Sequence, residues 1–313
     1  MPPDTLADSF GVHIAKIRFC APDGLTSRQY LPAALRAGLG NHLKRTVCIK
    51  HWQSPCEGCA IRNSCAYGGV FDPALPSGHE ARHGITSAPA RLMLVPDRLL
   101  PSHLPPGSEF DLELRLLGDV AHAHAEVLLN CLRRSAARLP GVSGGLQLIH
   151  CTAPAPYQPV TLLPDRRVLI EFITPLRIER AIKTPPLVSG RTRRKMLTVA
   201  ELDSTELFLA LAKRATMVFE HCLGRFDHGI RIREDVLPAA QRAQMHKIDL
   251  REHEEWRHPF GQGREVPLGG LIGRLLLADL DAPLRHLLVL GQVLGLGKQV
   301  VFGHGNYRLL GER

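Results

Sequence analysis

The sequence contains no uninterrupted apolar run of eighteen residues, which excludes a transmembrane helix of the usual length. Its first ten residues, MPPDTLADSF, have neither the basic nor the apolar segment of a secretory signal peptide. We therefore expect a cytoplasmic protein, in which the eight cysteines are free thiols or metal ligands rather than disulfides. Aromatic residues are also scarce, at 5% of the chain, which argues against an extensive aromatic surface.

The residues that are abundant indicate a folded, basic protein. Hydrophobic residues make up 44% of the 313 positions, enough for a core in one large domain or in two smaller ones. The formal net charge is +9 and the isoelectric point is near 9.4. Such a balance favours a polyanionic partner.

The first half of the chain predicts the order β-α-β-β-α-β, which is that of a ferredoxin-like unit. We predict strands over 13–19, 91–95, 109–117 and 144–151, and helices over 31–47 and 120–139. The proline-rich stretch 152–159 then forms a linker.

The second half predicts the same order of elements. The strands are expected over 167–173, 247–250, 270–276 and 299–310, and the helices over 204–223 and 282–294. The predicted fold is therefore α+β, with two tandem ferredoxin-like domains over residues 1–152 and 160–313.

Four of the cysteines gather behind the first predicted helix, in an insertion over about 48–73. They follow the pattern C-x7-C-x2-C-x5-C and are Cys48, Cys56, Cys59 and Cys65. The central spacing lets two thiolates hold one ion, so we expect a structural metal site with zinc or, alternatively, a [4Fe–4S] cluster. The other interpretation is a set of unrelated buried thiols.

A glycine-rich loop, residues 295–305, separates the last predicted helix from the last strand. Glycines let backbone N–H groups approach a ligand closely, and a neighbouring lysine favours an anion, so the loop predicts a phosphate site. Tight turns alone would explain the same glycines. Residues 177–195 add seven basic side chains against one acidic one, as either an arm along a nucleic-acid backbone or a solvated loop.

Three stretches give the chain a resemblance to a known family. They are GLGKQVVFGHGNYRL near the C-terminus, IEFITPLRI (Ile170–Ile178) and CAYGGVFDP (Cys65–Pro73). Together with the order of elements, they resemble the CRISPR precursor-RNA processing endoribonucleases of the RAMP superfamily, in the branch with an N-terminal cysteine cluster. The resemblance implies paired ferredoxin-like folds and cleavage of CRISPR repeat RNA into guide RNA.

The resemblance also implies metal-independent chemistry, in which a 2′-hydroxyl attacks the adjacent phosphate and leaves a 2′,3′-cyclic phosphate. Such a reaction needs a general base, a general acid and positive charge near the phosphorane. By resemblance, His42 is the first candidate for proton transfer, with Tyr30 beside it and Lys50 or Lys44 near the phosphate. His51 is the main rival of His42.

The remaining cations and the glycine loop are expected to form the RNA-binding surface, which would give salt-dependent affinity with little sequence preference. Trp52 and Tyr307 are the candidates for stacking on bases. The expected RNA-binding residues are Arg36, Lys44, Arg45, Arg191, Arg193, Arg194, Lys195, Gly295, Gly297, Lys298, Gly303, His304 and Gly305.

Two other functions remain open from the sequence. The chain could be a non-catalytic RAMP subunit that holds guide RNA in a CRISPR effector complex, with other effector subunits as partners. It could also be an unrelated nucleic-acid protein with a zinc or iron–sulfur site.

Overall fold

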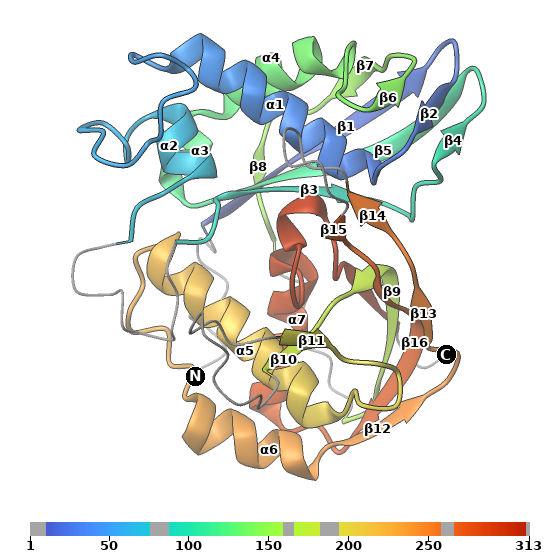
Figure 1. Ribbon diagram of the computed structural model, residues 1–313. Helices are drawn as coiled ribbons and strands as arrows, with labels where there is room; N and C mark the ends of the chain where they lie inside the picture. Colours follow the sequence, from blue (N-terminus) through green and yellow to red (C-terminus); the bar gives the residue numbers. More distant parts are fainter. Residues whose placement is uncertain (1–10, 76–87, 159–165, 182–193, 258–265, 311–313) are drawn as a thin grey trace, which may run out of the picture.

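Each half of the chain forms an antiparallel sheet with helices against one face (Figure 1). The computed structural model describes residues 11–75, 88–158, 166–181, 194–257 and 266–310. Among these residues, none of the helices combines the length and the apolar character needed to span a membrane. The two sheets confirm the predicted α+β fold with tandem ferredoxin-like domains.

The N-terminal domain contains the six predicted elements in the predicted order. They are β1 (Val12–Ala21), α1 (Leu31–Val47), β3 (Leu92–Pro96), β5 (Ser108–Leu117), α4 (Ala125–Ala136) and β7 (Gln147–Cys151). The strands are arranged as β3-β5-β1-β7, and every neighbouring pair is antiparallel. Short elements complete the domain: β2 (Leu25–Ser27), α2 (Ala66–Phe71), β4 (His103–Leu104), α3 (Asp119–Ala123), β6 (Val142–Ser143) and β8 (Ala155–Pro156).

Strand β1 shows why this sheet has two different faces. Ala15, Ile17 and Phe19 are buried in one core with residues of α1 and α4, whereas Lys16 and Arg18 are exposed. Successive side chains of a strand point to opposite faces. The helices therefore cover one face. The opposite face, which carries Val12 as well as Lys16 and Arg18, is turned toward the second domain.

The C-terminal domain repeats the arrangement, with strands in the order β12-β16-β9-β17. Its main elements are β9 (Val168–Leu176), α5 (Ser204–His221), β12 (Gln244–Lys247), β16 (Gly270–Ala278), α7 (Ala282–Leu294) and β17 (Tyr307–Leu310). Its shorter elements are β10 (Glu179–Ala181), β11 (Arg194–Met196), the π-helix η3 (Ile232–Val236), α6 (Leu237–Arg242), β13 (Arg251–His253), β14 (Trp256–Arg257), β15 (Val266–Pro267) and the 3-10 helix η4 (Val300–Phe302).

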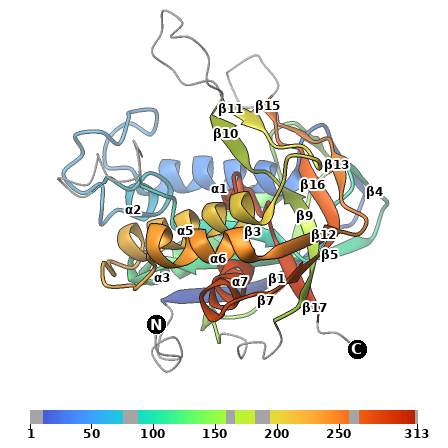
Figure 2. The same ribbon diagram turned by 90° about the horizontal axis from the view of Figure 1, so that it is seen from below.

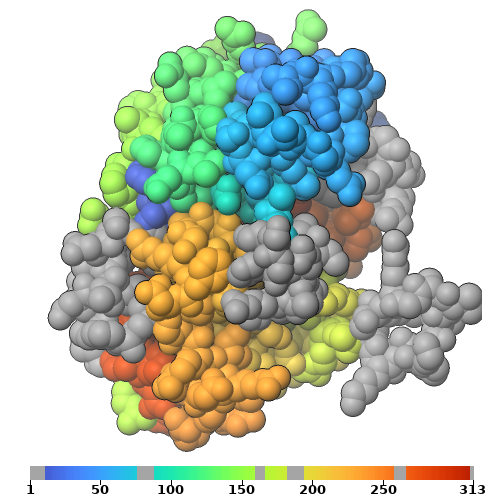
Figure 3. Space-filling view, turned by 90° about the vertical axis from the view of Figure 1, so that its left-hand side faces the viewer, coloured from blue at the N-terminus to red at the C-terminus, as the bar shows by residue number. Residues whose placement is uncertain are grey.

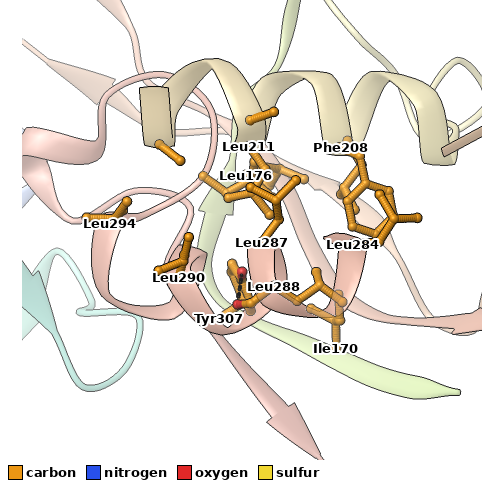
Figure 4. Close-up of a cluster of buried hydrophobic side chains, with 14 of the residues drawn as sticks. Ile170, Leu176, Phe208, Leu211, Leu284, Leu287, Leu288, Leu290, Leu294 and Tyr307 are labelled. Atoms are coloured by element: carbon orange, nitrogen blue, oxygen red, sulfur yellow. Dashed lines mark hydrogen bonds between the residues drawn. The ribbon is translucent and has the colours of Figure 1, made fainter. Parts of the chain in front are cut away.

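The helices of this domain lie together on one side of the sheet, as Figure 2 shows for α5, α6 and α7. Leucines of α7 interdigitate with Phe208 and Leu211 of α5 and with Ile170 of β9 (Figure 4). Tyr307 is buried among them, and its hydroxyl donates to the Leu288 carbonyl at 2.6 Å. Tyr307 therefore belongs to the core and is not available for stacking on a base.

The structure corrects the sequence-based elements at three places. The strand expected over 247–250 lies instead at β12 (Gln244–Lys247), and residues 248–250 form the bend before β13. The helix expected over 120–139 is divided into α3 and α4, because His124 leaves helical geometry with ψ of 11°. The strand expected over 299–310 starts only at Tyr307, and Val300–Phe302 form the turn η4 instead. Gln299 and Gly303 have φ of 63° and 80°, a left-handed conformation that no strand accommodates.

The two domains share an apolar interface. Val12, Met93, Val95 and Leu117 of the N-terminal domain belong to the same buried cluster as the core of the C-terminal domain. The described part of the predicted linker also lies against the first domain, because Ala155–Pro156 pair with β1. The domains are thus packed together rather than joined only by a chain.

A buried arginine adds a polar contact across this interface. Arg115 of β5 is 6% exposed and donates to the carbonyls of Gln292 and Val293, at 2.6 and 3.0 Å. Arg214 of α5 donates to the next carbonyl, that of Leu294, at 3.1 Å. The last carbonyls of a helix lack partners within the helix and carry partial negative charge. Two cations therefore cap the end of α7.

Replacing Arg115 by methionine is expected to destabilise the protein by about 2–4 kcal/mol, because the carbonyls of α7 and the Glu113 carboxylate lose a buried charged donor. Urea unfolding measures the change. Arg18→Met is the matched control, since Arg18 lies on the same sheet and its ion pair with Asp111 is about half exposed. Equal effects of the two substitutions would contradict a special role for Arg115.

Candidate functional site

Helix α1 carries the predicted catalytic residues at its two ends. Tyr30 is the N-cap, Pro32 lies in the first turn, and Lys44 and Arg45 lie in the last turn. Tyr30 and His42 are twelve residues apart, which is about 18 Å along a helix axis. The resemblance implied that Tyr30 lies beside His42. The structure instead separates the two residues along α1.

Tyr30 is buried between the two domains. It is 1% exposed, and its ring meets that of His304 edge-on, with centroids 4.6 Å apart. The two rings lie beside a small apolar cluster that includes Ala33 and Phe302. Burial raises the pKa of the Tyr30 hydroxyl, so it stays protonated. In this structure Tyr30 holds α1 against the glycine-rich loop.

His304 is completely buried in that loop. Burial, with smaller contributions from Arg177 and His253, lowers its pKa to about 3. The imidazole is therefore neutral near pH 7 and offers no positive charge to RNA. Sequence reasoning placed His304 on the RNA-binding surface, but the structure places it in the interior.

The backbone amides of the glycine-rich loop donate mostly within the protein. Gly303 and Gly305 donate to the carbonyls of Val300 and Pro175, both at 2.9 Å, and the Lys298 amide donates to the Arg177 carbonyl at 2.7 Å. Gly295, Gly303 and Gly305 are buried. The expected open phosphate cradle is therefore not formed by these three glycines, because protein carbonyls occupy that space. Gly297 is partly exposed and the Lys298 side chain is exposed.

Arg36 lies midway along α1, between aromatic rings of both domains. Its guanidinium is 4.7 Å from the Phe71 ring centroid in α2 and 5.6 Å from that of Phe302 in η4. These cation–π contacts place Arg36 at the seam between α1, α2 and the glycine-rich loop. Arg36 therefore has a packing role, and any contact with RNA, as predicted from the sequence, would be made in addition to it.

The predicted catalytic and RNA-binding residues at the C-terminal end of α1, and just after it, are at least partly exposed. His42 and Lys44 are partly exposed, and Arg45, Lys50 and His51 are exposed. Between residues 41 and 54 there are three lysine or arginine residues, two histidines and no carboxylate. This surface combines proton-transfer groups with positive charge.

The basic stretch after β9 is described only in part. Arg191 and Arg193 lie outside the described residues. Arg194 and Lys195 are exposed on β11, which pairs with β10. Lys195 forms an ion pair with Glu201 at 2.9 Å, so Arg194 is the better placed of the two for a phosphate.

The four clustered cysteines line one small pocket behind α1, together with Lys44 and Tyr67. Figure 3 shows this part of the chain at the surface in light blue. Within the described ranges, no three potential ligands stand close enough to hold a metal ion. Burial raises the pKa of the Cys56 thiol, partly opposed by Lys44. The four cysteines thus share one pocket.

A cavity of about 540 Å³ lies between the two domains. Its walls carry both charges, since Arg18 pairs with Asp111 and Arg115 pairs with Glu113. Four lysine or arginine side chains line it together with three carboxylates, so it attracts a polyanion less strongly than the segment 41–54, which has no carboxylate. The end of α1 is therefore the stronger candidate for contact with RNA.

Comparisons with known proteins agree with this fold. A Cas6 product complex is 16% identical, with a TM-score of 0.55, over 96% of this chain and 100% of that one. A Cas6-related protein from Pyrococcus furiosus is 10% identical, with a TM-score of 0.53, over 97% and 100%. A partial Cas6-RT-Cas1–Cas2 complex is 13% identical, with a TM-score of 0.55, over 97% of this chain and 47% of that one.

The sequence itself matches two family profiles, although it matches no curated protein. Residues 10–155 match a profile described as an N-terminal domain, and residues 170–307 match the profile of the CRISPR-associated endoribonuclease Cas6. The two matched stretches correspond to the two ferredoxin-like domains. The Cas6 profile over residues 170–307 and the shared fold together support a CRISPR Cas6, RAMP-type family for this chain.

Proposed function

We propose that this protein cuts CRISPR repeat RNA by metal-independent transesterification at the C-terminal end of α1. The observation that carries the proposal is the group of partly exposed His42 and exposed Arg45 and Lys50, in a segment, residues 41–54, that contains no carboxylate. Histidine exchanges protons near neutral pH, and the lysines supply charge for the phosphorane.

In the proposed step, His42 removes the proton of a 2′-hydroxyl, and the 2′-oxygen forms a bond to the adjacent phosphorus. The bond from phosphorus to the 5′-oxygen breaks, and that oxygen takes up a proton from an acid or from water. The products are a 2′,3′-cyclic phosphate and a 5′-hydroxyl. Lys50 is free to approach the phosphate, whereas Lys44 already donates to the Ser54 carbonyl at 2.8 Å. His51 remains the alternative proton carrier.

The proposed RNA surface extends from this end of α1 to Lys298 and Arg194. Backbone contacts of this kind fix the position of RNA, whereas hairpin shape and unpaired bases decide which RNA is bound. We also propose that the product stays bound, and that other CRISPR effector subunits are the protein partners.

The test is to incubate the protein with labelled repeat RNA in EDTA and to analyse the ends of the products. The proposal predicts one cut with a 2′,3′-cyclic phosphate end and unchanged activity in EDTA. Tight binding without any cut would instead identify a subunit that holds guide RNA. Cleavage that EDTA abolishes would contradict the metal-independent mechanism.

We further propose that the four clustered cysteines, which line one pocket, bind zinc. The purified protein is expected to contain about one zinc per chain, and Cys56→Ser is expected to lose it. Cys20→Ser, a partly exposed thiol outside the cluster, should keep the metal. Elemental analysis gives the metal content, and iron with visible absorbance would indicate the [4Fe–4S] alternative. Metal-free protein in which all four thiols react would contradict the site.

A further inference from the structure

The loop that follows α1 carries one of the two tryptophans of the chain on a basic surface. We infer that Trp52 and its neighbours form a stacking site for an unpaired nucleobase of the RNA, beside the proposed cleavage residues. The inference deepens the proposed function and rests on RNA being the substrate.

Contacts with α1 hold Trp52 in place. The Arg45 guanidinium lies 4.2 Å from the Trp52 ring centroid, and Lys44 donates to the Ser54 carbonyl at 2.8 Å. The Ser54 amide donates to the His51 carbonyl at 2.8 Å, which closes a turn around Trp52. An aromatic ring fixed in this way loses little conformational freedom when a ligand stacks on it.

The loop region that contains Trp52 also carries two exposed isoleucines, Ile49 and Ile61. Ile49 is 74% exposed, the highest value among the large hydrophobic residues that are described as exposed. Ile61 is 37% exposed and lines the same pocket as Ile49 and the cysteines. The His51 ring lies 6.0 Å from the Trp52 ring. Contact with a flat, weakly polar surface would remove these apolar groups from water, which is favourable in free energy.

The charge around this apolar surface selects the class of ligand. Arg45 lies against the Trp52 ring, Lys50 is two residues before it in the chain, and the segment 41–54 has no acidic residue. A nucleobase supplies the flat face and its phosphates supply the opposite charge, so single-stranded RNA satisfies both features. An apolar protein partner would leave the cations without a counterpart.

The position of Trp52 suggests which nucleotide it would bind. Arg45, which contacts the Trp52 ring, lies three residues after His42 and therefore on the same side of α1. A base stacked on Trp52 would lie close to a phosphate at His42. The site would thus hold an unpaired nucleotide that flanks the cleaved bond.

The first test uses fluorescence of a Trp256→Phe variant, in which Trp52 is the only tryptophan. Titration with an unstructured oligoribonucleotide at fixed salt is expected to quench this emission to saturation. The oligonucleotide cannot be cleaved if its 2′-hydroxyls are methylated, so the result does not depend on nuclease activity. Unchanged emission under conditions in which the RNA binds, as shown by its anisotropy, would overturn the inference.

The second test compares Trp52→Ala with Trp52→Phe and with Trp256→Ala as a matched control. Trp52→Ala is expected to weaken binding of repeat RNA with single-stranded flanks by about five- to a hundredfold. Trp52→Phe should restore most of the affinity, and Trp256→Ala should stay within about twofold. Equal losses from the two alanine variants would overturn the inference. Quenching and a Trp52-specific loss without any RNA cleavage would leave the stacking site in place and refute the nuclease alone.

Discussion

Replacement of His42 by alanine is expected to lower the cleavage rate at saturating protein by about 10²–10⁴-fold. His42 lies at the exposed end of α1 among cations, where it can exchange a proton with bound RNA. The affinity for repeat RNA should change little, because backbone contacts by the lysines and arginines supply most of it. Single-turnover cleavage and a binding isotherm at the same salt concentration measure the two effects separately.

His51→Ala is the control for this substitution, since His51 is also exposed and lies on the loop after the same helix. It should retain cleavage within about tenfold, because it is not the principal proton carrier. If His51→Ala abolished cleavage and His42→Ala did not, the roles assigned to the two histidines would have to be exchanged. If neither substitution affected cleavage, proton transfer at this end of α1 would be refuted.

Substitution of Gly305 by alanine is expected to destabilise the protein by about 3 kcal/mol or more. Gly305 has φ of 66°, and an added Cβ would overlap the carbonyl of Leu296, which is backbone and has little room to move. The Gly305 carbonyl also accepts the Leu296 amide at 3.1 Å. Urea unfolding should show the loss of stability, because the glycine-rich loop packs between the two domains.

Gly58→Ala is the control that separates the cost of a left-handed backbone from the cost of a steric overlap. Gly58 has nearly the same φ, 65°, but no atom lies within 4 Å of an added Cβ. Its substitution should therefore show only the cost of the left-handed conformation, about 1–2 kcal/mol. Equal effects at Gly58 and Gly305 would contradict the close packing of the glycine-rich loop. Tight binding of RNA by folded Gly305→Ala would agree with a structural role for this glycine.

The helices could be predicted from the sequence where local signals and periodicity agree. The expected bounds 31–47 and 282–294 coincide with α1 and α7, both of which have a proline in the first turn. The start of the final strand was predicted wrongly. Val300 and Val301 have strand propensity, but they follow Gln299, whose backbone is left-handed. The turn packs against β3, and Thr174 of β9 donates to the Gly303 carbonyl. These contacts are distant in the sequence and are not visible in its local pattern.

The candidate site could be predicted in residue type but not in arrangement. The sequence indicated a histidine and cations on the first helix, and the structure places them at its exposed end. It gave no sign that Tyr30 would be buried against His304, because these residues lie near opposite ends of the chain. Burial of the glycine-rich loop was missed for the same reason. Its amides are paired within the C-terminal domain, and two of their acceptors, the carbonyls of Pro175 and Arg177, lie more than a hundred residues away in the sequence.

The most direct test of the proposed mechanism uses repeat RNA with a single 2′-deoxy nucleotide at the mapped cleavage position. The 2′-hydroxyl is the proposed nucleophile, so the substituted RNA should bind with unchanged affinity and remain uncut. The unsubstituted RNA should be cut once in the same buffer containing EDTA. Cleavage of the 2′-deoxy RNA at the original position would contradict attack by the neighbouring hydroxyl, and with it the role proposed for the end of α1.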